Sequence, residues 1–159
     1  MTAHHRATRT ARAPVPKGCA RPAATLDPDE RACLFLTRCC FDYYTAPSPI
    51  LWKRAMRAAQ EQFGRDHGLD VFHALTVVLA RLRETRARVF LYHKPDCPAC
   101  SAWLTVHEAS LMGALAAVRR DDPCTALTMG LLVCDRGAPE PLLHGLTGLV
   151  VALRAGERG

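Results

Sequence analysis

The sequence predicts an all-α protein: a compact bundle of about six helices, one short extended segment leading into a CxxC turn, and a disordered basic N-terminal arm. Hydrophobic residues make up 49% of the 159 residues, which is enough for a sizeable core. Ala and Leu are abundant while aromatic residues make up only 6%, a composition that favours helix over sheet. Apolar side chains recur at helical spacing through most of the chain. We therefore expect a single helical domain over residues 27–159.

Residues 1–26 are predicted to form the disordered basic arm. Residues 1–24 hold five basic side chains and no acid, so they account for nearly all of the net charge of +6. Prolines at positions 14, 16 and 22 exclude a long helix there. An arm of this composition is typical of solvated, flexible termini and can contact nucleic acid weakly through its charge. The rest of the chain is nearly neutral.

The first helix is predicted to begin after Asp27, which can accept a hydrogen bond from the first turn. Pro28 suits the first helical position, and Asp29 and Glu30 favour the positive end of the helix dipole. The stretch "TAPSPI" ends this helix. A second helix follows from Ile50, and its apolar stripe consists of Trp52, Met56, Ala59 and Phe63.

The third helix, from Leu69 to about Arg83, has the clearest amphipathic pattern of the chain. The following run, 86–93, contains the β-branched and aromatic stretch "RVFLY" and is expected to be extended. Ser101 is expected to cap a fourth helix that ends near Arg120. Two more helices are predicted over 123–133 and 142–153.

The segment "FLYHKPDCPACSAWL" contains the strongest functional signal in the chain. Cys97 and Cys100 stand at CxxC spacing, and His93 precedes Cys97 by four residues. Two thiols at this spacing can bind one metal ion from a tight turn, or they can form a disulfide. No secretory signal is evident, so we expect a cytoplasmic protein, where clustered thiols indicate metal or redox chemistry. The longest apolar runs, 71–80 and 142–153, are too short and interrupted for a membrane span.

The favoured interpretation is a zinc site formed by Cys97, Cys100, His93 and His73. The third helix spans roughly 22 Å at 1.5 Å per residue. The extended run of 86–93 retraces roughly 26 Å at 3.3 Å per residue. If the chain doubles back, His93 returns to the level where the helix began. The fourth ligand stays open at this stage, the other candidates being His67, His107, Cys124 and Cys134.

The spacing His67-x25-His93-x3-Cys97-x2-Cys100 resembles the metal pattern of zinc-associated anti-sigma factors. The match is in spacing alone. In that family the H-x3-C-x2-C unit lies along a helix, whereas Pro95 and Pro98 exclude a helix here.

The alternative is a thiol–disulfide oxidoreductase with Cys97 as the nucleophile and Cys100 as the resolving thiol. The sixteen residues "VFLYHKPDCPACSAWL" resemble the active-site segment of thioredoxins and glutaredoxins. The remaining 55 residues after Leu104 do not supply the strands and cis-proline loop of that fold.

The expected function is a small zinc-binding regulatory or adaptor protein that acts through a protein partner. Zinc held by thiolates and imidazoles is usually structural. No Ser-His-Asp set, paired carboxylates or H-E-x-x-H motif indicates an enzyme. The other cysteines in apolar runs are expected in the core, namely Cys33, Cys39, Cys40, Cys124 and Cys134.

Overall fold

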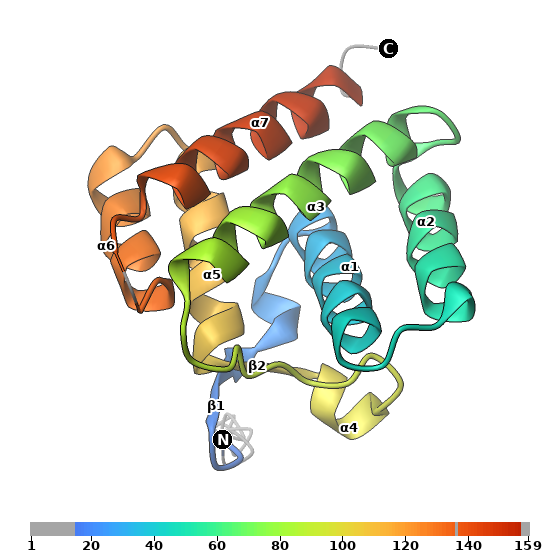
Figure 1. Cartoon of the computed structure of the whole chain (residues 1–159), viewed down its shortest axis with the longest axis horizontal. Helices are drawn as coiled ribbons and strands as arrows, with labels where there is room; N and C mark the ends of the chain where they lie inside the picture. Colours follow the sequence, from blue (N-terminus) through green and yellow to red (C-terminus); the bar gives the residue numbers. More distant parts are fainter. Residues whose placement is uncertain (1–14, 136, 157–159) are drawn as a thin grey trace, which may run out of the picture.

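The computed structural model describes residues 15–135 and 137–156, and it confirms the predicted helical bundle (Figure 1). Six longer helices and one short helix occupy these residues. Their bounds are α1 Pro28–Thr45, α2 Pro49–Phe63, α3 His67–Thr85, α4 Pro98–Ser101, α5 Val106–Arg119, α6 Pro123–Val133 and α7 Glu140–Gly156. None of the helices in the described residues has the length and apolar character that a membrane crossing requires.

The core lies where α3 and α7 run side by side, with α1 and α5 packed beneath them (Figure 1). Its largest fully buried side chains are mostly leucines from these four helices, including Leu36, Leu75, Leu79, Leu82, Leu111, Leu115, Leu142, Leu146 and Leu149. Burial of leucines on this scale is the dominant stabilising term in a bundle of this kind.

Two short strands join the N-terminal segment to the middle of the chain. Strand β1 (Cys19–Pro22) pairs antiparallel with β2 (Trp103–Thr105), and a 3₁₀ turn over Ala23–Thr25 follows β1. The amide of Ala23 also donates to the carbonyl of Ala102 at 2.8 Å. The sequence interpretation places these residues in the disordered arm, but the structure folds them against the domain. Residues 1–14 lie outside the described residues, so the nucleic-acid contact of the arm stays a prediction.

Helix α1 starts as the sequence predicts, with a complete capping box. The Asp27 carboxylate accepts from the Glu30 amide at 2.8 Å, and Glu30 accepts from the Asp27 amide at 3.2 Å. Arg119, in the last turn of α5, donates to Asp27 and Asp29. Ion pairs therefore link the start of α1, where the helix dipole favours acidic residues, to the end of α5, where it favours basic residues.

Helix α5 begins at Val106 rather than near Ser101, which corrects the sequence prediction. Thr105 accepts from the Glu108 amide at 3.1 Å, and Glu108 accepts from the Thr105 amide at 2.9 Å. This Thr-x-x-Glu capping box satisfies two amides that would otherwise lack partners, so it fixes the helix start. Residues 103–105 are free to pair with β1 as a result.

The extended run of residues 86–93 crosses the C-terminal end of α1 instead of returning to the start of α3. Phe90 stacks on Phe41 with ring centroids 4.6 Å apart, and the Tyr92 hydroxyl donates to Asp42 at 3.1 Å. These aromatic contacts direct the run away from α3. The start of α3 lies instead against the end of α2, where Gly68 is so close that a Cβ would stand 2.5 Å from the Ala59 carbonyl oxygen.

A buried ion pair joins α1 to α5. Arg38 and Glu108 have side-chain exposures of 4% and 0%. The guanidinium donates to both carboxylate oxygens, through Nε at 2.7 Å and Nη2 at 2.9 Å. Such a two-pronged arrangement satisfies both charges at fixed geometry. Arg38 also donates to the carbonyls of Ser101 and Trp103, at 3.1 and 2.7 Å.

Glu108→Gln is expected to lower the free energy of unfolding by about 3 kcal/mol or more, because it leaves the Arg38 charge buried without its counterion. The measurement is equilibrium unfolding in urea. Glu84→Gln is the matched control, since it breaks the exposed Arg81–Glu84 pair and should cost less than about 0.5 kcal/mol. Equal losses of stability in the two variants would contradict a stabilising role of the buried Arg38–Glu108 pair.

Candidate functional site at the CxxC loop

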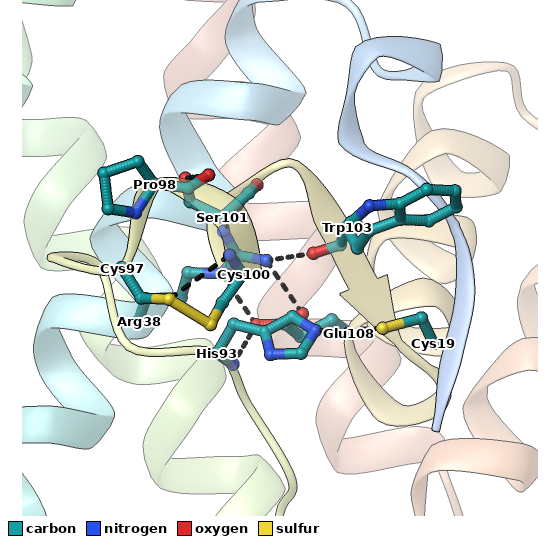
Figure 2. Close-up of a disulfide and its surroundings, with 9 residues drawn as sticks. All are labelled: Cys19, Arg38, His93, Cys97, Pro98, Cys100, Ser101, Trp103 and Glu108. Atoms are coloured by element: carbon teal, nitrogen blue, oxygen red, sulfur yellow. Dashed lines mark hydrogen bonds and ion pairs between the residues drawn. A yellow bond between two sulfur atoms is a disulfide. The ribbon is translucent and has the colours of Figure 1, made fainter. Parts of the chain in front are cut away.

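Cys97 and Cys100 are joined by a disulfide at one end of the bundle (Figure 2). Their Cα atoms lie 5.2 Å apart, within the range that disulfides require. Cys97 caps the short helix α4, and its Sγ accepts from the Cys100 amide at 3.3 Å. Both cysteines are half-buried and the intervening Pro98 and Ala99 are exposed. The bond is therefore at the surface, where another molecule can contact it.

The buried ion pair anchors both ends of the loop that carries the disulfide. Before the loop, the amide of His93 donates to Glu108 at 3.1 Å. After it, the carbonyls of Ser101 and Trp103 accept from Arg38, as the dashed lines of Figure 2 show. The disulfide is thus attached to a scaffold whose own geometry does not depend on the sulfurs.

Charged side chains hold the outer part of the loop against α1 and α2. Asp96 forms an ion pair with Arg54 of α2. The amine of Lys94 lies 3.9 Å from the Asp42 carboxylate of α1. These pairs are exposed and contribute little to stability, but they place both signs of charge beside the disulfide.

Cys19 is a third cysteine at this site, and the sequence interpretation did not find it. Its Sγ lies 3.4 Å from Nε2 of His93, and in the view of Figure 2 the imidazole stands between Cys19 and the disulfide. Cys19 is held in place by strand pairing, because it lies opposite Thr105 in the register of β1 and β2. The two residues of the contact are 74 positions apart, so no local spacing could indicate it.

The other predicted ligands lie elsewhere. His73 is exposed on α3, and His67 packs edge-on against Phe63 at the far end of α2. Within residues 15–135 and 137–156, no three His, Cys, Asp or Glu side chains are arranged to hold a metal ion. The zinc site with His73 as the fourth ligand is therefore not assembled in this disulfide-bonded form.

His107 supports the backbone before the site. Its Nδ1 accepts from the Leu91 amide at 2.8 Å, and its ring packs near Phe90. Burial lowers the pKa of the imidazole below its ordinary value of 6.5, and the nearby Arg86 guanidinium lowers it further. A neutral ring is the form that accepts this hydrogen bond.

The remaining cysteines differ in burial, and burial shifts the pKa of their thiols. Burial raises the pKa of Cys33 and Cys40 to about 12 and that of Cys39 to about 11. Burial likewise raises the pKa of Cys134, whose thiol donates to Thr85 at 3.2 Å. Core placement of these four is confirmed. Cys124 is instead exposed near the start of α6, so the prediction of a core position is wrong for it.

No family model, curated protein or solved structure matches this chain. The geometry of the site is therefore the basis for the functional proposals.

Thiol labelling should separate the cysteines into two sets. Only the thiolate reacts, so the buried thiols with raised pKa should resist a maleimide in the folded protein. After reduction, Cys19, Cys97, Cys100 and Cys124 should be labelled first, as peptide mass spectrometry would report. Before reduction, Cys97 and Cys100 should be missing from this set. Fast labelling of Cys33 in the folded protein would contradict the buried placement of the α1 thiols.

Acidification is expected to destabilise the protein through His107. Because the folded pKa is below the unfolded value of 6.5, the unfolded state takes up the proton first as the pH falls. Stability should drop as the pH falls through the unfolded-state pKa of 6.5 and level off below the lower folded-state pKa, and the drop should be smaller in His107→Gln. Urea unfolding at several pH values measures it. His144→Gln, at an exposed position of α7, should keep the pH dependence of the parent protein.

Proposed function

We propose that the Cys97–Cys100 pair is a reversible thiol–disulfide switch, through which a small helical regulatory protein acts on a protein partner. The observation that carries the proposal is the bonded pair of sulfurs in a surface loop whose two ends are held by the Arg38–Glu108 pair. Exchange with a partner's thiols requires access to the sulfurs, and the half-buried positions allow it.

The exchange proceeds in two balanced steps. A thiolate of the partner attacks Cys97, the bond to Cys100 breaks, and its electron pair leaves on the Cys100 sulfur, which takes up a proton. A second thiol of the partner then attacks the mixed disulfide and releases Cys97. The partner loses two electrons to the Cys97–Cys100 pair and forms its own disulfide. In the opposite direction Cys97 is the nucleophile and Cys100 is the resolving thiol.

Two features support this exchange. The Cys100 amide donates to the Cys97 sulfur at 3.3 Å, and a hydrogen bond to a thiolate favours the charged form. The thiols with strongly raised pKa lie in the core, so competing reshuffling with them is slow. In the cytoplasm, the compartment that we propose, disulfides are usually transient and serve catalysis or sensing.

The test is a redox titration of the folded protein in glutathione buffers, followed by the count of free thiols. One reversible two-electron transition is expected, and it should vanish in Cys97→Ser. In Cys100→Ser, Cys97 should accumulate as a mixed disulfide with glutathione, because the resolving thiol is missing. Cys124→Ser is the matched control and should titrate like the parent protein. Absence of a reversible transition in the parent protein would refute the proposed switch.

A zinc-binding adaptor is the second candidate. The reduced pair offers two thiolates, and His93 adds a nitrogen at the H-x3-C-x2-C spacing. The observation in its favour is that Nε2 of His93 already faces a sulfur, that of Cys19. Metal analysis by mass spectrometry, on reduced protein purified without a tag or chelator, tests it. Protein that contains no zinc after reduction and incubation with zinc chloride would exclude this candidate.

A further inference from the structure

We propose that Cys19 completes a four-ligand zinc site with His93, Cys97 and Cys100, and that this site forms when the Cys97–Cys100 disulfide is reduced. The inference rests on the reversible reduction proposed above. It differs from the sequence interpretation in the fourth ligand, which comes from β1 rather than from α3. Zinc binding and the disulfide would exclude each other, because both use the sulfurs of Cys97 and Cys100.

The separation of Cys19 and His93 matches a shared zinc ion. Zinc bonds of about 2.3 Å to sulfur and about 2.0–2.1 Å to nitrogen, at tetrahedral angles, place the two ligand atoms about 3.6 Å apart. The observed distance from Sγ to Nε2 is 3.4 Å. The contact is also of the right kind: in the tautomer whose Nε2 carries no hydrogen, the thiol donates to Nε2 and the imidazole lone pair points at the sulfur. Zinc would take the place of the thiol hydrogen.

Both of these ligands are held by hydrogen bonds from outside the CxxC loop. Cys19 is fixed by the pairing of β1 with β2, and the backbone of His93 is fixed by its hydrogen bond to Glu108. Sites whose ligands are positioned by a supporting shell bind metal more tightly than sites that must organise on binding. Half of the site is therefore preorganised.

The other half, Cys97 and Cys100, has to assemble after reduction. Two sulfurs on one tetrahedral zinc ion lie about 3.8 Å apart, a spacing that side chains with Cα atoms 5.2 Å apart can adopt once the sulfurs separate. None of the residues from 94 to 100 is buried, so turning the loop toward His93 breaks the weak surface pairs of Asp96 and Lys94 but no core packing. The amide hydrogen bond to Cys97 Sγ would then stabilise a zinc-bound thiolate.

An external disulfide such as oxidised glutathione is the oxidant that returns the zinc-bound form to the disulfide form. Its two sulfur atoms accept the two electrons that the zinc-bound Cys97 and Cys100 thiolates lose, and it leaves as two thiols after taking up two protons. The Cys97–Cys100 bond forms, zinc leaves as the divalent ion, and Cys19 regains its proton. Zinc binding reverses this protonation, so it is weaker at low pH.

Metal titration of the reduced protein tests the proposal. Zinc is titrated in competition with a chromophoric chelator, and cobalt is used as a spectroscopic substitute. The parent protein should bind one zinc ion per chain, with intense tetrahedral cobalt bands and sulfur-to-cobalt charge transfer. Cys19→Ser should weaken zinc by more than about 10-fold, since even the loss of a residue outside the ligand shell has that effect. The charge-transfer band should also weaken in Cys19→Ser, while Cys124→Ser should match the parent protein.

The outcomes separate this inference from the proposed switch. Unchanged zinc affinity and cobalt spectrum in Cys19→Ser would overturn the role of Cys19, as would equal zinc binding by the oxidised protein. The glutathione transition of Cys19→Ser should stay reversible, because Cys97 and Cys100 are both present. Loss of that transition in the parent protein would instead refute the switch itself.

Discussion

The Arg38–Glu108 pair is the interaction on which the loop, the strands and the start of α5 all depend. A single guanidinium binds the carboxylate and two backbone carbonyls, and the same carboxylate accepts two backbone amides. Each charge is thereby compensated at a buried position, which is the condition under which a buried pair is tolerable. Because its partners lie before and after the CxxC loop, the pair turns a stretch with little regular structure into a fixed frame. The sulfur atoms sit outside that frame and can change partners without altering it.

The fold separates two populations of cysteine. Those on the inner side of α1 act as small apolar side chains, and their environment suppresses ionisation. At the CxxC site, Cys97 accepts a hydrogen bond from the Cys100 amide, Cys19 contacts the His93 imidazole, and all three cysteines are partly exposed to solvent. This division allows redox or metal chemistry at one end of a protein whose core also contains thiols. If the reduced loop binds zinc, as we propose, it has two closed states, one held by a covalent bond and one by an ion, that would present different surfaces to a partner.

The helices could be predicted from the sequence because their spacing and caps are local, and the cap at Asp27 is an example. The CxxC pair was equally visible. The buried role of Arg38 was not, although a lone charge within "LFLTRCCF" is a signal that a partner exists elsewhere. Thr105 and Glu108 also carried a capping-box pattern that would have placed the start of α5 correctly. Cys19 could not be found this way, since its importance comes from pairing with a strand far along the chain, within a segment whose composition suggests disorder. The path of residues 86–93 depends on the stacking of Phe90 on Phe41, and the spacing of residues along the sequence does not reveal such a contact.

The distance along the chain between Cys19 and His93 has a kinetic consequence. Contacts across 74 positions form late, because the loop-closure entropy must be offset by structure already present. The docking of α1 onto α5 has a similar entropic cost, because Arg38 and Glu108 are 70 positions apart, whereas the CxxC turn closes across only three positions. A newly made chain would thus acquire its dithiol pair before it acquires the third cysteine beside it. Oxidation at that stage would capture the loop in its disulfide form, so the order of folding itself favours one of the two states.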